Sequence, residues 1–205
     1  MVDKICNFLV EKMKKEMPEI DDEKAEIITY GLKIMIGEIP KIFIVFLVSV
    51  LLNIWKNTLL TFLIILPYRA FAGGVHLKTH LGCIIATTTM YCLPGVIAKY
   101  IDIGIYKYAL ILLVWIFAIS MIKLYAPADT ENVPILRKKD RRKRQILSYI
   151  IVSLLSIIAI FINTEISNLI IISIFIQTLT ITRFIYKLTK NNYGYEVYNA
   201  DIQTN

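Results

Sequence analysis

The sequence predicts an all-α polytopic membrane protein with about six transmembrane helices, preceded by an N-terminal interfacial amphipathic helical region. Hydrophobic residues make up 57% of the 205 residues and charged residues only 19%, whereas soluble domains average about 45–50% apolar and about 25% charged residues. The charged residues form blocks that separate long apolar runs, as loops do between membrane spans. This block pattern accounts for the net charge of +7 without a nucleic-acid partner.

Residues 1–40 are expected to form a cytoplasmic or interfacial helical region. Apolar side chains between Ala25 and Ile39 recur near helical spacing, with charged residues between them. Such a pattern is typical of an amphipathic helix that lies at the bilayer surface. Pro40 is expected to end this helix, because proline lacks a backbone N–H donor and clashes with the preceding turn.

Six apolar runs follow and are expected to span the membrane. A helix needs about 20 apolar residues to cross a hydrocarbon core of roughly 30 Å. The first two runs are shorter and are separated by Lys56 and Asn57, so they form either two shallow spans or one bent helix. We favour two spans, because only Lys56, Lys99 and Lys107 among the 23 Lys and Arg residues then lie outside, as the positive-inside rule requires. The expected spans are residues 42–55, 58–67, 81–98, 108–125, 146–162 and 168–186.

This topology predicts a multi-pass cell-membrane protein with both termini in the cytoplasm. The chain 1–205 is expected to form a single membrane-embedded domain. Its expected parts are the region 1–40, a short helical hairpin at 41–67, a polar cytoplasmic loop at 68–80, spans three and four at 81–125, a basic cytoplasmic loop at 126–145, spans five and six at 146–187, and a cytoplasmic tail at 188–205.

A polar stretch between the second and third spans gathers the reactive side chains. It holds both histidines of the protein, His76 and His80, and Cys83, one of three cysteines. A cysteine nucleophile needs a nearby base or cation to hold it as thiolate. On one continuous helix His76 and Cys83 would stand about 10 Å apart along the axis, too far for a hydrogen bond. A catalytic pair therefore requires a break in the helix, and Gly73 and Gly74 let the backbone turn sharply just ahead of His76.

Thr79 is expected to cap the helix that forms the third span. This cap places Cys83 in the first helical turn, where the dipole and the free N–H groups favour a thiolate. His76 would then lie on the preceding loop and fold back toward Cys83. His80 is an alternative base, because it lies three residues before Cys83 on the same helix face.

Other interpretations of these residues remain open at the level of sequence. His76, His80 and Cys83 could bind a metal, but position 77 is Leu rather than the Glu that zinc peptidase helices use as base, so no metal or other cofactor is expected. Arg69 is either a snorkelling anchor at the end of the second span or a carboxylate-binding residue. Cys6 and Cys92 are expected to play no part in the chemistry. The total of three cysteines is odd, which argues against a disulfide framework.

A basic cluster precedes the fifth span. It consists of Arg137, Lys138, Lys139, Arg141, Arg142, Lys143 and Arg144. Such a cluster sets topology and binds anionic lipid. It is also suited to dock an acidic peptide by electrostatic attraction.

Two motifs together resemble those of the accessory gene regulator B (AgrB) family. The first is Arg69-x-x-x-Gly73-Gly74-x-His76-x6-Cys83, and the second is Tyr125-Ala126-Pro127-Ala128 ahead of the basic cluster. The resemblance extends to length, polar N-terminus and span pattern. It implies a multi-pass membrane cysteine endopeptidase of a Gram-positive quorum-sensing system, with a homodimer as the expected assembly and no cofactor.

The resemblance also implies roles for individual residues. The catalytic cysteine and histidine of the family match Cys83 and His76, and its essential arginine and glycine match Arg69 and Gly74. Loop 68–80 is then the catalytic loop, on the cytoplasmic side of the membrane. Gly73 lies in a variable part of the motif, and His80 is not part of it. The resemblance assigns no third residue that orients the histidine, and Asp129 is a hypothesis for that role.

The implied substrate is an AgrD-type pheromone propeptide with an amphipathic N-terminal helix and an acidic C-terminal tail. The expected reaction releases this tail through a thioester acyl-enzyme and closes a thiolactone or lactone ring. The basic cluster is the expected docking site for the tail. A peptide exporter or transporter is one alternative, disfavoured because the later spans carry no acidic residue in mid-span. A non-catalytic membrane scaffold is the other.

Overall fold

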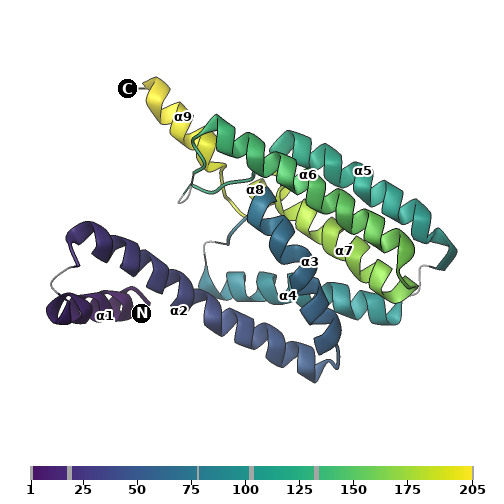
Figure 1. Ribbon diagram of the computed structural model, residues 1–205, viewed down its shortest axis with the longest axis horizontal. Coiled ribbons are helices and arrows are strands. Elements are labelled where there is room, and N and C mark those ends of the chain that lie inside the picture. The colour runs from purple at the N-terminus through teal and green to yellow at the C-terminus, as the bar shows by residue number, and fades with distance from the viewer. Residues whose placement is uncertain (1, 18–19, 78, 102–103, 132–133, 205) are drawn as a thin grey trace. The chain divides into compact units, whose positions relative to one another are not determined.

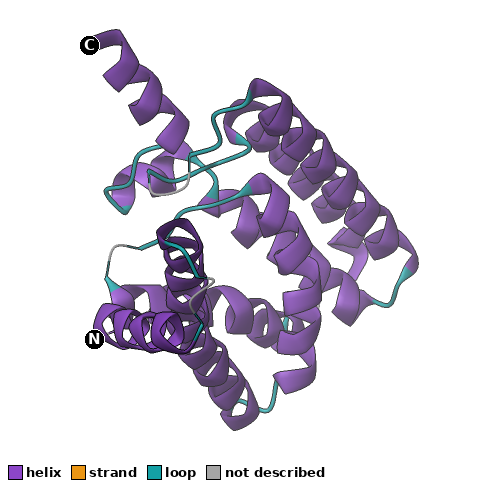
Figure 2. Cartoon of the chain, turned by 60° about the vertical axis from the view of Figure 1, so that its left-hand side comes forward, coloured by secondary structure: helices purple, strands orange, loops and turns teal. Residues whose placement is uncertain are grey.

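A computed structural model describes residues 2–17, 20–77, 79–101, 104–131 and 134–204. The regular elements in these ranges are all helices, as Figures 1 and 2 show. The chain divides into two compact units, Met1–Leu47 and Val48–Asn205. The expected all-α class is therefore confirmed.

The first unit contains α1 (Val2–Glu16) and most of α2 (Asp22–Leu51). The expectation that a helix ends at Pro40 is wrong, because α2 continues through this proline. Lys41 pairs with Glu38 across the proline turn. The apolar residues that follow favour an unbroken helix, since a helix satisfies its own backbone hydrogen bonds where water is scarce.

The second unit is a helical bundle in which α7 (Thr164–Thr180) occupies the centre. This helix packs against α3 (Trp55–Ala72), α4 (His80–Tyr100), α5 (Lys107–Tyr125) and α6 (Lys138–Phe161). Figure 1 shows α5, α6 and α7 running side by side. A short 3-10 turn, η1 (Gly104–Tyr106), precedes α5, and α8 (Arg183–Leu188) and α9 (Gly194–Thr204) follow α7.

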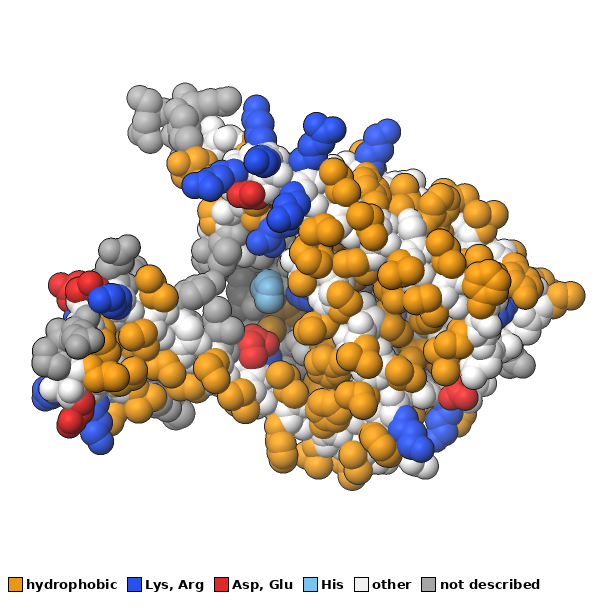
Figure 3. Space-filling model, in the orientation of Figure 1, with side chains coloured by type: hydrophobic (Ala, Val, Ile, Leu, Met, Phe, Trp, Pro, Cys, Tyr) orange, Lys and Arg blue, Asp and Glu red, His pale blue; other side chains and the backbone are white. Residues whose placement is uncertain are grey.

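The bundle buries polar side chains and exposes apolar ones, as a membrane protein does. Asn168, Ser173 and Gln177 of the central helix are buried, and the Ser167 hydroxyl donates to the Ala159 carbonyl of α6 over 2.9 Å. Hydrogen bonds of this kind join helices in lipid. Outward-facing side chains of the surrounding helices are mostly hydrophobic and cover much of the surface in Figure 3.

Three helical segments are long and apolar enough to cross a membrane, by length and composition, within the described part of the chain. They are Leu81–Tyr100, Gly104–Tyr125 and Lys138–Phe161, and Thr164–Thr180 is a shorter apolar helix. The third and fourth expected spans lie within the first two segments, and the fifth extends one residue beyond the last segment, to the C-cap residue Ile162. The sixth expected span is too long, because the helix ends at Thr180 and Thr182 caps the separate helix α8 with its side chain.

The first two expected spans belong to separate helices, but the break lies elsewhere. The chain turns at residues 52–54, rather than at Lys56 and Asn57. Asn53 adopts a left-handed conformation, with φ of 53°, which asparagine tolerates better than most residues. The turn therefore comes before the polar pair that suggested it.

The basic cluster is helical, which corrects the expected loop at 126–145. The loop ends at Arg137, and the remaining basic residues form the first two turns of α6. Lysine and arginine are good helix formers, so a charge-rich sequence without proline or glycine extends the apolar helix outward. The expected tail at 188–205 also contains a helix, α9.

Candidate active site

The loop after α3 starts from a glycine that no other residue can replace without strain. Gly73 ends α3 with φ of 76°. A Cβ atom here would lie 2.2 Å from the Ala128 carbonyl oxygen. This close approach permits a short parallel bridge. In it the Ala128 N–H donates to the Ala72 carbonyl over 2.8 Å, and the Gly74 N–H donates to the Ala128 carbonyl over 3.0 Å. The bridge joins the two sequence motifs, although 55 positions separate the paired residues Gly73 and Ala128.

Arg69, in the last turn of α3, holds the loop that follows. Its Nη2 donates to the Val75 carbonyl over 2.7 Å, and its Nη1 lies 3.4 Å from the side-chain oxygens of Gln177 and Thr180. A Cβ atom at Gly74 would come within 2.7 Å of both Arg69 Nη1 and Thr180 Oγ1. The arginine and the glycine of the motif therefore act together, because the guanidinium occupies the space that a side chain at position 74 would need.

The C-terminal end of α7 completes the support of this loop. Gln177 Nε2 donates to the Gly73 carbonyl over 2.9 Å, and the Val75 N–H donates to the Thr180 carbonyl over 3.1 Å. Sequence reasoning did not assign a role to either α7 residue. The available signal was Gln177 itself, a polar side chain in an otherwise apolar run.

Cys83 lies in the first turn of α4, as expected. The Thr79 side chain caps the helix by accepting from the Gly82 N–H over 3.2 Å. The Cys83 N–H donates to the Thr79 carbonyl over 2.9 Å. None of the three cysteines forms a disulfide; Cys83 is partly exposed, while Cys6 and Cys92 are buried. Cys83 is therefore the thiol that a substrate can reach.

His76 lies on the non-helical segment between α3 and α4, and its side chain is exposed. This placement confirms the expected break ahead of α4. Its backbone carbonyl accepts a hydrogen bond from Asn191 Nδ2 over 2.9 Å. The pairing of its imidazole with the Cys83 thiol stays a prediction. His80 is the first residue of α4, and its side chain lies outside the described part of the structure.

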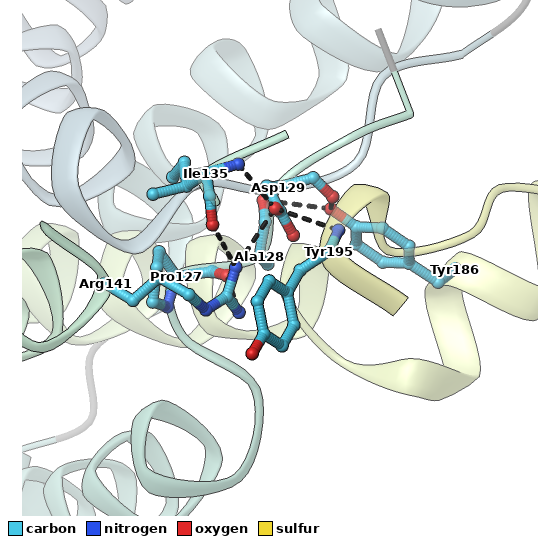
Figure 4. Close-up of polar contacts among 7 residues, drawn as sticks. All are labelled: Pro127, Ala128, Asp129, Ile135, Arg141, Tyr186 and Tyr195. Carbon is cyan, nitrogen blue, oxygen red and sulfur yellow. Dashed lines mark hydrogen bonds and ion pairs between the residues drawn. The ribbon is translucent and has the colours of Figure 1, made fainter. Parts of the chain in front are cut away.

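Asp129 organises the segment between α5 and α6. Its buried carboxylate accepts at Oδ2 from the Ile135 N–H (2.8 Å), Arg141 Nη1 (3.0 Å) and the Tyr195 N–H (3.1 Å), as Figure 4 shows. These three contacts stabilise the loop, and none of them reaches His76. They also engage Arg141, one of the basic residues expected to dock a substrate.

An open pocket of about 620 Å³ lies beside the basic cluster. It faces the end of α3, where Arg144 Nη1 approaches the Ala70 carbonyl at 3.4 Å. Figure 3 shows basic side chains, in blue, gathered at one edge of the second unit. The pocket combines an apolar lining with charged side chains: Ala70, Phe71, Pro134, Ile135, Leu136 and Leu147 with Arg137, Asp140, Lys143 and Arg144. This composition suits a ligand with both acidic and apolar side chains.

Among the described residues, no three His, Cys, Asp or Glu side chains lie together as candidate metal ligands.

Substitution of Gly73 should destabilise the protein. Gly73→Ala forces a side chain into a positive-φ position and against the Ala128 carbonyl, which should lower Tm in detergent by about 5 °C. Gly31→Ala is the matched control, because a Cβ at that helical position meets no atom within 4 Å. Equal Tm values for the two variants would contradict the close approach.

Comparison with known proteins places the chain in a family. The model of the family described as accessory gene regulator B matches residues 6–181. An AgrB-like protein of Listeria innocua is 29% identical over 87% of each chain. Accessory gene regulator protein B of Staphylococcus aureus (strain MW2) is 26% identical over 76% of this chain and 81% of its own. No solved structure matches the chain. Because the family model covers most of its length, the chain belongs to the accessory gene regulator B family.

Proposed function

We propose that this protein is a membrane cysteine endopeptidase that releases the C-terminal tail of an AgrD-type pheromone propeptide. Membership of the family implies an accessory gene regulator role in pheromone processing. The observation that carries the finer proposal is the position of Cys83. Its partly exposed thiol lies in the first turn of α4, directly after a loop that bears His76 and is held by Arg69.

The first step is cleavage by a thiolate. The imidazole of His76 takes the proton of the Cys83 thiol, and the sulfur attacks the scissile carbonyl carbon. The C–N bond breaks, His76 returns the proton to the leaving amine, and the released tail leaves a thioester on Cys83. N–H groups in the first turn of α4 that lack an intrahelical partner are suited to stabilise the oxyanion.

The second step is ring closure. A cysteine of the substrate attacks the thioester carbonyl, its proton passes to the departing Cys83 sulfur, and a thiolactone forms. Exchange of one thioester for another is close to balanced, whereas a serine enzyme would leave an ester from which a thioester forms uphill. This balance favours cysteine as the nucleophile. A substrate serine in the same place would give a lactone.

In this proposal Arg69 and Gly74 are positioning residues. The guanidinium already donates to the Val75 carbonyl and lies against Gln177 and Thr180. The role of Arg69 in this proposal is therefore to fix the backbone that carries His76. Asp129 stabilises the neighbouring loop through Ile135 and Tyr195, which supports a structural role for it in preference to an orienting one.

The pocket beside α6 is the proposed dock for the acidic tail. Cationic side chains at a helix N-terminus face the positive end of the helix dipole, and an anionic peptide would relieve this repulsion. Arg137 and Lys143 line the pocket and are exposed, so they are available to a ligand. Ala70, one of the residues that line the pocket, lies near the C-terminal end of α3. Binding the tail there would hold the scissile bond near Cys83 and reduce the entropic cost of the reaction.

The proposed topology places this chemistry at the cytoplasmic face. Both termini, the His76 loop and the basic cluster lie inside, following the positive-inside rule. The amphipathic helix of the precursor would lie in the bilayer surface. We also propose a homodimer embedded in the lipid bilayer, as the family resemblance implies.

Replacement of the nucleophile should abolish processing. Vesicles with the wild-type protein should convert the precursor into a free tail and a cyclic product. Mass spectrometry should show that this product is one water lighter than the linear form of the same tail-free peptide. Cys83→Ala should yield neither product, and Cys92→Ala, which removes a buried thiol, should yield both. Processing by Cys83→Ala, or none by well-inserted wild type, would favour a scaffold or an exporter instead.

Charge reversal in the pocket should weaken precursor binding. Arg137→Glu with Lys143→Glu should raise KM about tenfold and change kcat less, because exposed ion pairs contribute about 0.2–1 kcal/mol each. Lys138→Glu with Lys139→Glu makes the same change of charge outside the pocket lining. An equal rise of KM in both variants would show general attraction and contradict docking in the pocket.

Labelling from the two sides of the membrane tests the topology. The 24 residues of α6 extend about 36 Å at 1.5 Å per residue, enough to cross the hydrocarbon core. In a background without native cysteines, Lys139→Cys should react only from the cytoplasmic side and Asn163→Cys only from outside. Reaction of both from one side would refute the proposed arrangement.

A further inference from the structure

The segment that follows α8 contacts the loop that carries His76, one residue beyond the carbonyl that Arg69 binds. Asn191 Nδ2 donates to the His76 carbonyl over 2.9 Å. The same amide group lies 3.0 Å from Thr189 Oγ1 and 3.2 Å from the Thr189 carbonyl, and the Asn191 N–H donates to the Tyr186 carbonyl over 2.9 Å. The side chain is thus fixed at its base and directed at His76.

Two stacked tyrosines anchor this segment to the bundle. The ring centroids of Tyr186 and Tyr193 lie 4.1 Å apart, and the ring planes meet at an angle of 10°. The Tyr193 hydroxyl donates to the Ile181 carbonyl over 2.9 Å, and the Tyr186 hydroxyl donates to the carbonyls of Ala128 (3.0 Å) and Asp129 (3.1 Å). Burial raises the pKa of both phenols, so their hydroxyls remain protonated donors over the physiological pH range.

The Ala128 carbonyl links the anchor to the candidate site. Its oxygen accepts from the Tyr186 hydroxyl and from the Gly74 N–H, which uses both of its lone pairs. Residues that follow the central helix therefore bind the same carbonyl that fixes the turn ahead of His76. Figure 4 shows Tyr186 beside Ala128 and Asp129.

The far end of the segment is clamped to the loop between α5 and α6. A Cβ atom at Gly194 would lie 2.2 Å from the Thr130 carbonyl oxygen, so the two backbones are in close contact. The Tyr195 N–H donates to Asp129, and the Arg141 guanidinium lies 4.4 Å from the centre of the Tyr195 ring. The segment is thereby held at both ends, with Asn191 between its anchors and His76.

We propose that residues 189–195 form a C-terminal strap that positions His76 for the reaction, and that Asn191 is its positioning residue. This inference rests on the proposed function of His76 as the base. The strap lies beyond residue 181, where the match to the family model ends. By fixing the His76 carbonyl, Asn191 restricts the backbone from which the imidazole reaches toward Cys83.

The test compares Asn191→Ala with Asn192→Ala in the full-length protein. Asn192 is the matched control, because its amide donates to the exposed Glu131 side chain over 2.7 Å and not to His76. For Asn191→Ala, kcat for the precursor should fall about tenfold with KM unchanged, since a looser base affects the chemical step more than binding. Asn192→Ala should retain both constants. Asn191→Asp, which keeps the size but replaces the donor with an acceptor, should lose as much activity as Asn191→Ala.

Hydrogen exchange gives a readout that needs no activity. Amides of residues 74–77 should exchange faster in Asn191→Ala than in Asn192→Ala, while those of α7 stay unchanged. If Asn191→Ala shows this selective change but the wild-type protein processes no precursor, the strap is supported and the proposed function is refuted. An unchanged exchange rate, or a kcat that matches wild type once it is expressed per folded molecule, would overturn the strap.

Discussion

The hydrogen bond from Arg69 to the Val75 carbonyl is the interaction on which the candidate site depends. A guanidinium that is partly withdrawn from water needs hydrogen-bond acceptors, and here these are a loop carbonyl and the polar end of α7. Satisfying the charge therefore fixes the loop that carries His76. The absence of a side chain at Gly74 is the matching requirement, because a Cβ would occupy the position of the guanidinium.

The site is assembled from segments that are far apart in the sequence. The Ala128 carbonyl, in the loop before α6, binds the turn after α3 and the Tyr186 hydroxyl of α8. The end of α7 and the strap bind the same turn at Gly73, Val75 and His76. Each of these contacts engages a backbone N–H or carbonyl group, so the geometry depends on main-chain positions rather than on a cluster of charged side chains. Loops held by a rigid scaffold in this way commonly carry catalytic residues.

Local features of the site were predictable from the sequence because they depend on neighbouring residues. The Thr79 cap, the first-turn position of Cys83 and the break ahead of His76 follow from cap chemistry and glycine flexibility. The all-α class followed from composition. Helix ends were less predictable. Lipid favours a helix that continues through Pro40, and the helix propensity of lysine and arginine extends α6 through the basic cluster.

Long-range contacts were not predictable from one sequence. The carboxylate of Asp129 carries no local signal that it binds Tyr195, which lies 66 positions later. The same holds for Asn191 and His76, which are 115 positions apart. A polar C-terminal segment after the last apolar run resembles a solvated tail. Only the fold shows that Tyr193 of this segment is buried and stacked on Tyr186 of α8.

The most direct test of this account is whether position 76 meets Cys83. In a background with Cys6→Ala and Cys92→Ala, the variant His76→Cys should form an internal disulfide with Cys83 under mild oxidation, detected by mass spectrometry of the digested protein. Val75→Cys should not, because the carbonyl and N–H of Val75 are bound to Arg69 and Thr180, which fixes that residue against α7. Efficient cross-linking from position 75, with none from position 76, would contradict the proposed pairing of base and nucleophile.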